Sequence, residues 1–343
     1  MDAAQRQARP TLVSIARELG VSRQTVSNVL NNPTIVHPQT RARVDAAIKR
    51  SGYRPSAAGK ALRTQRSMAI GLRLYGAVDG INGAVMDRFL HSLADEAQRL
   101  GYQVTLLTAA DGDGEVDKLE GLYRSASIDL AVLTDTGADD PRPEQLQEAL
   151  VPFVAFGRPW GRLGTSDHCW VDVDGSAGTA AAARWLRELG HRSIGFLGWP
   201  EGSGVGDDRR AGWRHAVADL PESADLSVAV LDDHPSAGAE GTTELIARGA
   251  TAIVCASDSL ALGALGHFRT LGRTGDGPVP VVGFDDTPVA RATGLSSVHQ
   301  PVEEAAVSVL ELGLALLDGS RPEQPQRLLE PHLVRRNLQR FAR

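Results

Sequence analysis

The sequence is poor in cysteine, with only Cys169 and Cys255 among its 343 residues. These two residues lie far apart and match no metal-ligand spacing, so we expect neither a disulfide framework nor a cysteine-bound metal. A reduced, cytoplasmic protein is the simplest account of so little cysteine.

The sequence also lacks the hydrophobic segments that direct proteins to membranes. No apolar run approaches the about 20 residues of a membrane-spanning helix, and the polar residues 1–10 contain no apolar signal-peptide core. We therefore expect no contact with a membrane. Hydrophobic residues still make up 42% of the chain, which is enough for the cores of two or three domains.

Motifs of catalysis are scarce as well. The chain has no G-x-S-x-G segment and no H-x-x-x-H pair. The glycine-rich run Gly202–Gly206 has neither dinucleotide-binding spacing nor a phosphate-loop lysine, which favours a flexible loop at a cleft edge over a phosphate-gripping role. Asp172 and Asp174 have the spacing of residues on one face of a strand, but no metal-binding or glycosidase partner is evident. The sequence therefore predicts no enzyme, no catalytic residue, no metal site and no cofactor.

Positive charge is concentrated at the N-terminal end. Residues 1–66 contain twelve Lys or Arg and three acids, a net charge of +9. Residues 67–343 contain 24 basic and 39 acidic residues, a net charge of −15. Although a charge cluster is often only a solvated surface, a basic segment on an acidic body indicates that the basic segment alone binds a polyanion.

The segment at residues 11–32, TLVSIARELGVSRQTVSNVLNN, predicts two short helices joined by a tight turn. Thr11 can cap the first helix, Gly20 stands where a left-handed residue ends it, and Ser22 can cap the second helix. Apolar residues at helical spacing give the helices facing stripes, namely Leu12, Ile15, Ala16 and Leu19 on the first and Val26, Val29 and Leu30 on the second.

The polar face of the second helix carries side chains suited to reading DNA. Arg23, Gln24, Ser27 and Asn28 lie opposite the apolar stripe. A helix-turn-helix places its second helix in the major groove, where Arg pairs with guanine and Gln with adenine. An ordinary helical hairpin would show the same pattern, but the surrounding positive charge favours DNA binding.

A third helix and a basic segment follow. Pro38 suits the first turn of this helix and Gly52 its end. The alanine-rich centre of residues 53–66 is too short for a stable isolated helix, so we interpret the segment as a hinge that orders on DNA or against a partner copy. Leu62 has no local core and suits a wedge between base steps of the minor groove. A simple linker with an incidental leucine is the alternative.

From Met68 onward, β-rich runs alternate with helix-like stretches. This alternation predicts parallel, doubly wound sheets with ligands at the carboxyl ends of the strands, and the length favours two sheets with a cleft between them. The predicted strands are Ala69–Leu74, Gln103–Thr108, Leu130–Leu133, Phe153–Phe156, Ile194–Gly198, Val228–Leu231, Ala252–Cys255 and Val279–Phe284.

Several predicted strands end in polar and aromatic side chains. These side chains include Arg73 with Tyr75, the run Phe156–Trp160, Trp199, Ser257 with Asp258, and Asp285 with Asp286. Charged planar side chains form paired hydrogen bonds with vicinal hydroxyl groups, and aromatic rings pack against the apolar C–H faces of sugars. Arg158, Trp160, Arg209 and Asp285 together have the character of a carbohydrate site.

Six segments, in order, give the chain a close resemblance to the LacI/GalR family of transcriptional regulators. They are TLVSIARELGVSRQTVSNVLNN, TRARVDAAIKRSGYRPSAAGKALRT, LGHRSIGFLG, DDRRAGW, ASDSLALGAL and VVGFDDTP. The resemblance implies an all-α helix-turn-helix head, a hinge helix and an α/β core of two doubly wound subdomains, similar to type I periplasmic binding proteins. It also implies a homodimeric repressor of carbohydrate-utilisation genes, with operator DNA and a small carbohydrate effector as partners; a tetramer is left open.

The resemblance assigns roles to individual residues. Arg23 and Gln24 occupy the main base-reading positions, and Leu62 matches the intercalating hinge leucine. Arg209 matches the effector-binding arginine, and Asp285 matches the aspartate that binds sugar hydroxyls. The expected DNA contacts are Thr11, Ser22, Arg23, Gln24, Thr25, Ser27, Asn28, Asn31, Tyr53, Ala58, Lys60, Leu62 and Arg63. The expected effector contacts are Arg73, Tyr75, Arg158, Trp160, Arg209, Ser257, Asp258 and Asp285.

The expected domain boundaries follow from the same resemblance. They are a head at residues 1–52, a hinge at 53–66 and a core at 67–343. The core is expected to divide into an N-subdomain at 67–168 and 298–327 and a C-subdomain at 169–297 and 328–343, with chain crossings near 167–170, 294–298 and 326–331.

The chain also departs from the family pattern. Asn28 stands where arginine is common, and Gly59 lowers the helix propensity of the hinge by about 1 kcal/mol relative to alanine. Arg73, Tyr75 and Phe156–Trp160 are not general family features, so they are expected to distinguish the ligand of this chain.

Two functions from other classes are the alternatives. A periplasmic-type sugar-binding protein would share the core but is opposed by the basic head and the missing signal segment. A sugar-processing enzyme with an appended DNA-binding head would need a phosphate loop or a catalytic aspartate constellation, which the sequence does not offer.

Overall fold

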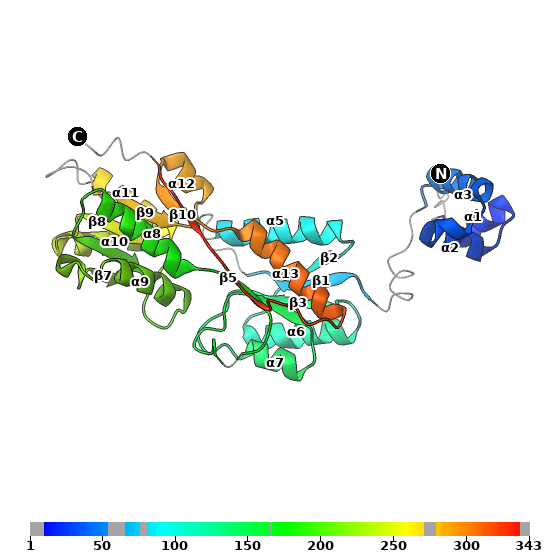
Figure 1. Ribbon diagram of the computed structural model, residues 1–343, viewed down its shortest axis with the longest axis horizontal. Coiled ribbons are helices and arrows are strands. Elements are labelled where there is room, and N and C mark those ends of the chain that lie inside the picture. The colour runs from blue at the N-terminus through cyan, green and yellow to red at the C-terminus, as the bar shows by residue number, and fades with distance from the viewer. Residues whose placement is uncertain are drawn as a thin grey trace, which may run out of the picture. The chain divides into compact units, whose positions relative to one another are not determined.

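The computed structural model describes residues 10–53, 66–75, 81, 83–164, 166–270 and 279–336. The chain forms two compact units, residues 1–66 and 67–343, whose elements are labelled in Figure 1. Among the helices of the described ranges, none is both long enough and apolar enough to cross a membrane.

The first unit has the two-helix turn that the sequence predicts. Its elements are α1 (Leu12–Leu19), α2 (Arg23–Asn31), the 3-10 helix η1 (Pro33–Ile35) and α3 (Pro38–Ser51). The Thr11 hydroxyl caps α1 by accepting from the Ser14 N–H at 3.1 Å, and the Ser22 hydroxyl caps α2 by accepting from the Thr25 N–H at 3.0 Å. Gly20 ends α1 in the left-handed conformation, which confirms the predicted turn.

A small apolar core holds the three α-helices of this unit together. Its buried side chains are Ile15, Ala16, Val26, Val29, Val44 and Ala47. They come from all three helices, so the predicted facing stripes are confirmed. Leu30 is the exception: it is half-buried and lies outside this cluster.

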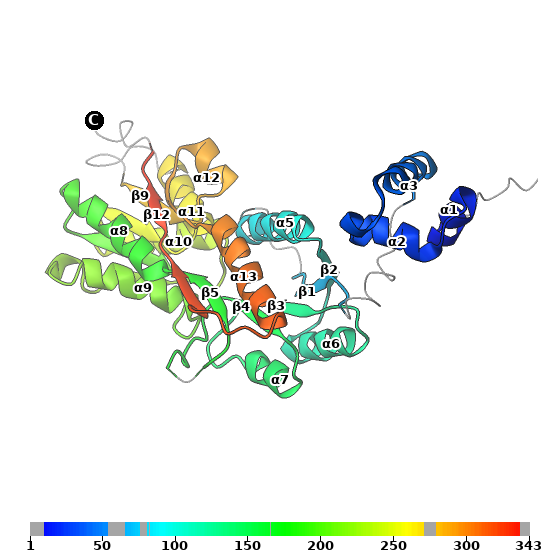
Figure 2. The same ribbon diagram turned by 45° about the vertical axis from the view of Figure 1, so that its right-hand side comes forward.

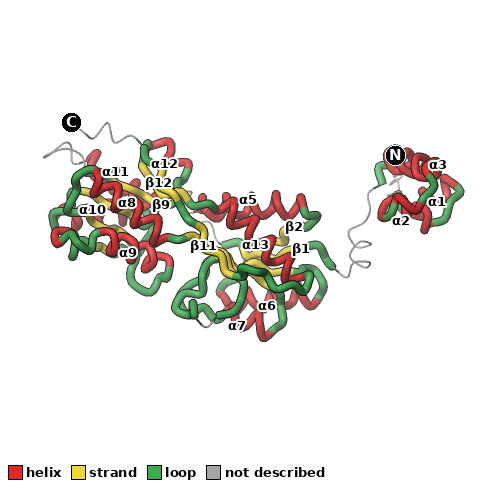
Figure 3. The backbone as a smooth tube through the Cα atoms, in the orientation of Figure 1, coloured by secondary structure: helices red, strands yellow, loops and turns green. Residues whose placement is uncertain are grey.

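The second unit contains two six-stranded sheets, each flanked by helices (Figure 3). The strands of the first, sheet A, are β1 (Ala69–Arg73), β2 (Gln103–Leu107), β3 (Leu130–Leu133), β4 (Phe153–Phe156), β5 (Trp170–Val173) and β11 (Gln326–Leu329). Their order is β11-β5-β4-β3-β1-β2, and all neighbours are parallel. We call the subdomain built on sheet A the N-subdomain.

Helices cover both faces of sheet A (Figures 1 and 2). They are α5 (Gly83–Arg99) and α13 (Val302–Leu317) on one face, and α6 (Gly112–Arg124) and α7 (Arg142–Glu148) on the other. Ile70 and Leu72 of β1 pack with the first pair of helices, whereas Ala69 packs with the second. Because successive side chains point to opposite faces, a strand buried on both sides is apolar throughout.

The second sheet, sheet B, forms the C-subdomain. Its strands are β6 (Ile194–Gly198), β7 (Ser227–Ala229), β8 (Ala252–Cys255), β9 (Val281–Phe284), β10 (Ser296–His299) and β12 (His332–Val334). The order is β12-β10-β9-β8-β6-β7, and the edge strand β12 is antiparallel to β10. Each of the eight predicted strands overlaps a strand of the structure, whereas β5, β10, β11 and β12 are absent from the predictions.

Sheet B is also covered on both faces. Its helices are α8 (Gly175–Glu188), α9 (Val205–Ala216), the 3-10 helix η2 (Pro221–Ser223), α10 (Pro235–Ala247), α11 (Asp258–Thr270) and α12 (Pro288–Thr293). On β6, Phe196 stacks with Trp213 of α9, whereas Gly195 on the opposite face leaves room for Leu245 of α10. The predicted doubly wound architecture is therefore confirmed for both subdomains.

The chain passes between the subdomains three times, and two crossings lie later than expected. β5 pairs with β4 and β11 and therefore belongs to sheet A. The first crossing thus follows β5, at Asp174, instead of lying at residues 167–170. β10 pairs with β9, so the second crossing follows at residues 300–301 instead of 294–298. The third crossing, between β11 and β12, agrees with the expected range of 326–331.

The glycine of the R-x-x-G-W segment lies where α8 and α9 meet. A Cβ atom at Gly212 would lie 2.0 Å from the carbonyl oxygen of Ser176 and 2.5 Å from Thr179 Oγ1. The Thr179 hydroxyl itself donates to the carbonyl oxygen of Arg209 at 2.6 Å. This close approach of two helices needs glycine, and it fixes the part of α9 that carries Arg209.

Gly212→Ala should lower the free energy of unfolding by about 1–3 kcal/mol, because the added methyl group forces α8 and α9 apart. Gly266→Ala on α11 is the matched control, since a Cβ atom at Gly266 meets open space. This control should gain about 0.5–1 kcal/mol from helix propensity. Urea unfolding of both variants checks the pair, and equal stability of Gly212→Ala and the wild type would contradict the close packing.

Candidate functional site

A cavity of about 240 Å³ lies between the two subdomains, at the carboxyl ends of parallel strands. We call it the cleft. The charged side chains that line it are Asp135, Arg158 and Asp172 from the N-subdomain and Asp208, Arg209, Asp233 and Asp285 from the C-subdomain. Both subdomains therefore contribute charged groups to one cavity.

Asp285 lies in the turn after β9, with a φ of 110° that few non-glycine residues adopt. Its side chain is almost fully buried, and Gln300 Nε2 donates a hydrogen bond of 2.6 Å to its Oδ1 atom. Burial raises the pKa of Asp285 to about 8, because the charged form loses its hydration. A strained turn and a buried acid of this kind are typical of ligand sites.

Arg209 projects from α9 into the same end of the cleft. Its guanidinium carbon lies 3.8 Å from the centre of the Phe284 ring, and its Nη1 atom donates to the carbonyl oxygen of Ala256 at 2.5 Å. Its Nη2 atom lies 3.7 Å from Asp285 Oδ1, and its Nε atom is buried without a hydrogen-bond partner among the described residues. The structure thus brings Arg209 and Asp285 side by side.

Arg158 follows β4 and reaches across the cleft. Its Nε atom pairs with Asp172 Oδ2 on β5 at 2.6 Å, and its Nη2 atom pairs with Asp208 Oδ2 on α9 at 2.7 Å. Burial raises the pKa of Asp172, although the Arg158 charge beside it acts in the opposite direction. Since Asp172 belongs to the N-subdomain and Asp208 to the C-subdomain, one guanidinium group connects the two subdomains.

Trp160 lies between Arg158 and the glycine-rich loop at Gly202–Gly206. The guanidinium carbon of Arg158 lies 4.4 Å from the centre of the Trp160 ring, a cation–π distance. A Cβ atom at Gly204 would lie 2.5 Å from Trp160 Cγ, so the loop backbone packs directly on the indole. The loop therefore lies beside the cleft, where Val205 also lines the cavity.

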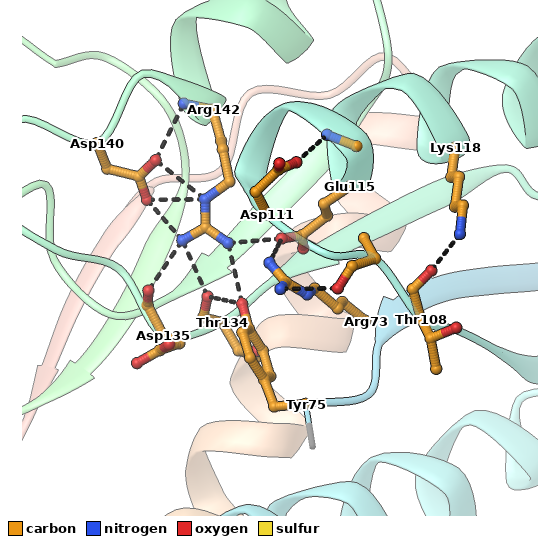
Figure 4. A network of polar contacts seen from close by, with 12 residues as sticks. Arg73, Tyr75, Thr108, Asp111, Glu115, Lys118, Thr134, Asp135, Asp140 and Arg142 are labelled. Carbon is orange, nitrogen blue, oxygen red and sulfur yellow. Dashed lines mark hydrogen bonds and ion pairs between the residues drawn. The ribbon is translucent and has the colours of Figure 1, made fainter.

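Arg73 and Tyr75 are not among the residues that line the cleft, contrary to the prediction. Arg73 Nη1 pairs with the buried carboxylate of Glu115 at 3.1 Å, and the Tyr75 hydroxyl donates to the Thr134 carbonyl oxygen at 3.0 Å. Arg142 pairs with the same carboxylate at 2.7 Å (Figure 4). Two arginines therefore compensate one buried acid, and Arg142 also donates to the carbonyl oxygens of Thr134 and Asp135 in the loop after β3. The Glu115 carboxylate thus engages Arg73 outside the cleft lining.

Ser257 and Asp258 lie behind the cleft wall. The Ser257 hydroxyl donates to Asp233, which does line the cleft. Asp258 accepts from the Thr287 N–H at 2.8 Å and from the Ser297 hydroxyl at 2.6 Å. Both residues support the lining and its turns. Neither lines the cleft, although both were predicted to contact the effector.

Some polar residues of the cleft are missing from the sequence predictions. They are Asp135 and Thr136 after β3, Asp208 next to Arg209, Asp233 after β7, and Gln300 after β10. Asp135 and Asp233 follow predicted strands, so the rule that ligands bind beyond the carboxyl ends of parallel strands could have found them. Gln300 gave no such signal because β10 was not predicted.

The exposed face of α2 carries the predicted base-reading side chains. Arg23 and Gln24 are exposed, and Ser27 and Asn28 are half-buried. Gln24 Nε2 donates to Asn28 Oδ1 at 2.9 Å, which aligns the Gln24 amide along the helix. The structure thus leaves Arg23 and Gln24 accessible to a partner.

The other predicted DNA contacts lie in helix caps, against the core of the head or outside the described residues. Thr11, Ser22 and Thr25 take part in the caps of α1 and α2. Tyr53 is half-buried against the core of the three helices. Ala58, Lys60, Leu62 and Arg63 lie outside the described residues, as does the side chain of Asn31.

Asp285→Asn should make the stability of the protein less dependent on pH. The folded-state pKa of Asp285 is raised from 3.8 to about 8. Between these values the unfolded chain releases the proton of Asp285 while the folded protein keeps it, so the free energy of unfolding falls as the pH rises. Asn resembles the protonated acid, so the variant should lose less stability than the wild type between about pH 5 and pH 8. Urea unfolding at both pH values measures this difference.

Asp225→Asn is the control for this experiment, because Asp225 is exposed and does not line the cleft. It should keep the pH dependence of the wild type. Identical pH dependence of Asp285→Asn and the wild type would show that the buried Asp285 does not hold its proton in the folded state.

Comparisons with known proteins identify both units. The profile of bacterial regulatory proteins of the lacI family matches residues 11–56, and that of the periplasmic binding protein-like domain matches residues 183–337. The lac repressor dimer bound to operator and the anti-inducer ONPF has a TM-score of 0.79, covering 95% of this chain and 98% of the repressor chain. At 23% identity this likeness shows the fold.

Two relatives show the family. The HTH-type transcriptional regulator CelR of Thermobifida fusca is 33% identical, covering 96% of this chain and 98% of the relative, and AglR of Rhizobium meliloti (strain 1021) is 32% identical, covering 91% and 90%. A solved CelR–cellobiose complex is 31% identical with a TM-score of 0.69, covering 96% of this chain and 99% of that chain. This chain therefore belongs to the LacI/GalR family of DNA-binding, helix-turn-helix transcriptional regulators.

Proposed function

We propose that this regulator is a homodimeric repressor of carbohydrate-utilisation genes whose operator binding is controlled by a small sugar in the cleft. The observation that carries the proposal is a single cavity shared by two subdomains, with Arg209 and Asp285 on one side and Arg158 on the other. The solved relative CelR, a complex with cellobiose, supports a sugar as the ligand.

The chemistry of the cleft suits a polyhydroxylated ring. Asp285 can accept or donate a hydrogen bond according to its protonation, and the Arg209 guanidinium beside it is a planar donor. Trp199 and Phe284 add aromatic surface to the same end of the cleft, which suits the apolar faces of a sugar. Of the eight predicted effector contacts, we retain Arg158, Trp160, Arg209 and Asp285.

Control of DNA binding requires that the ligand distinguishes two arrangements of the subdomains. Here the subdomains contact each other through the Arg158–Asp208 ion pair and through the packing of Gly204 on Trp160. A ligand seated among these groups changes the free energy of those contacts. Allosteric coupling of this kind typically amounts to about 1–3 kcal/mol.

We infer that the ligand is bound and not transformed. The relatives named above are transcriptional regulators. The described residues that line the cleft include no serine, cysteine, lysine or histidine, which leaves its aspartates as the groups that could act as nucleophile or base. Arg158, Asp172 and Asp208 are already engaged with one another.

The DNA-binding role is assigned to the exposed face of α2 and to the positive charge around it. Glu18 and Asp45, the acids of residues 10–53, are paired with Arg50 and Arg41. Arg17, Arg23 and Lys49 are exposed and thus available to phosphates, whose contacts supply non-specific affinity. We assign the base preference to Arg23 and Gln24, because contacts with base edges, unlike phosphate contacts, depend on the DNA sequence.

Arg23→Ala should weaken operator binding by about 1–3 kcal/mol and relax the base preference at one position per half-site. Lys49→Ala is the control, because Lys49 is exposed on α3, where a phosphate contact would affect all sequences alike. Binding to a set of single-base operator variants measures both. An unchanged order of preference in Arg23→Ala would mean that another face reads the DNA.

Asp285→Ala should leave operator binding intact while weakening the sugar response about 10- to 100-fold, because the sugar hydroxyls lose a buried hydrogen-bond partner, at a cost of about 1–3 kcal/mol. Asp225→Ala, outside the cleft, should respond as the wild type does. Operator release is followed by fluorescence anisotropy during sugar titration. A wild-type response in Asp285→Ala would place the effector elsewhere.

A further inference from the structure

The cleft is strongly acidic. The charged groups in its lining are Asp135, Asp172, Asp208, Asp233, Asp285, Arg158 and Arg209, which gives a formal charge of −3, or −2 while Asp285 holds its proton. No lysine or histidine occurs among the described residues of the lining. An anionic ligand would therefore need one of the two arginines as its partner.

Arg158 is not available as that partner. Its Nε atom is 2.6 Å from Asp172 and its Nη2 atom is 2.7 Å from Asp208, while Trp160 covers the guanidinium from the side. One cation is thus shared by two carboxylates. A phosphate at Arg158 would have to displace Asp172 or Asp208, and the displaced carboxylate would remain in a poorly hydrated site without its cation.

Arg209 is also flanked by an acid. Its Nη2 atom lies 3.7 Å from Asp285 Oδ1, and its Nη1 atom is bound to the carbonyl oxygen of Ala256. A phosphate or carboxylate at Arg209 would share the lining with the carboxylate of Asp233 and would lie beside Asp285, whose ionisation it would oppose further. Like charges within one poorly hydrated cavity repel each other strongly.

The glycine-rich loop offers a second kind of anion site, and the chain fills it. Backbone N–H groups of such loops bind phosphate when they point at a common centre. Here the N–H groups of Gly202 and Gly204 donate to Asp207 Oδ2 at 2.8 and 3.4 Å. The other oxygen of Asp207 pairs with Arg210 at 3.0 Å. A carboxylate of the protein therefore occupies the place that a phosphate would take.

The N-terminus of α8, which adjoins the cleft, is filled in the same way. Asp174 accepts from the Ala177 N–H at 2.8 Å, and Asp208 Oδ2 accepts from the Ser176 N–H at 2.9 Å. These N–H groups and the positive end of the helix dipole are ordinarily attractive to anions. The Ser176 and Ala177 N–H groups are thus already bound by aspartates of the protein.

We propose that the cleft selects an uncharged carbohydrate and rejects its phosphorylated or acidic counterpart, because Arg158, the glycine-rich loop and the N-terminus of α8 are already occupied by carboxylates of the protein and Arg209 lies in an acidic lining. This inference rests on the proposed sugar response and specifies the class of sugar. It predicts a regulator that responds to sugars before phosphorylation or oxidation adds a charge.

The test uses the full chain and matched pairs of probes. The pairs are cellobiose with cellobionate, glucose with glucose 6-phosphate, and galactose with galacturonate. Binding is measured by isothermal titration calorimetry. In each pair that binds, the uncharged member should bind at least about tenfold more tightly, since unpaired like charges in the cleft cost at least 1.4 kcal/mol. Tighter binding of a charged member overturns the inference while leaving a sugar response in place.

A variant tests the cause of the selectivity. Asp208→Asn removes one of the carboxylates that engage Arg158 and should reduce the preference for the uncharged member by at least about threefold. Asp225→Asn removes an exposed charge outside the cleft and should leave the ratio unchanged. An equal ratio in Asp208→Asn and the wild type contradicts the role given to the Arg158 ion pairs. Absence of binding by every probe overturns the proposed sugar response itself, and the inference with it.

Discussion

The Arg158 guanidinium group, held between Asp172 and Asp208, is the interaction on which the geometry of the cleft depends. It is the ion pair that connects a carboxylate of each subdomain through a single cation. Breaking one side of a buried pair typically costs about 3–5 kcal/mol, so the present arrangement of the subdomains is not changed freely. A ligand that competes with or reinforces this pair can shift the arrangement, and such a bistable contact is what allosteric control requires.

The acids around the cleft have a shared consequence. Asp207 fills the glycine-rich loop, Asp174 and Asp208 fill the N-terminus of α8, and Asp172 shares Arg158 with Asp208. Each contact stabilises local structure, and together they occupy Arg158 and the N–H groups that an anion would use. Arg209, the buried acid Asp285 and aromatic surface are suited to the hydroxyl groups of a ligand, and Arg158 borders the same cavity with its charge already paired.

The sequence predicted the head and most of the strands because their patterns are local. Thr11, Gly20 and Ser22 cap or end helices as their types suggest, and the apolar strands stand out from their surroundings. β10, which reads SSVH, was missed because its buried hydroxyls depend on distant partners: Ser297 bonds to Asp258. Arg73 was misplaced for the same reason, since nothing near it in the sequence indicates that Glu115 is buried beside it.

The central claim is that a sugar in the cleft and operator DNA at the head bind with linked free energies. Linkage is reciprocal, so DNA must change the affinity for the sugar by the same factor by which the sugar changes the affinity for DNA. The direct measurement is calorimetric titration of a bound sugar, first with the free protein and then with saturating operator duplex. The account predicts a change of about 5- to 150-fold that equals the change in operator affinity. An identical sugar affinity with and without operator would contradict it.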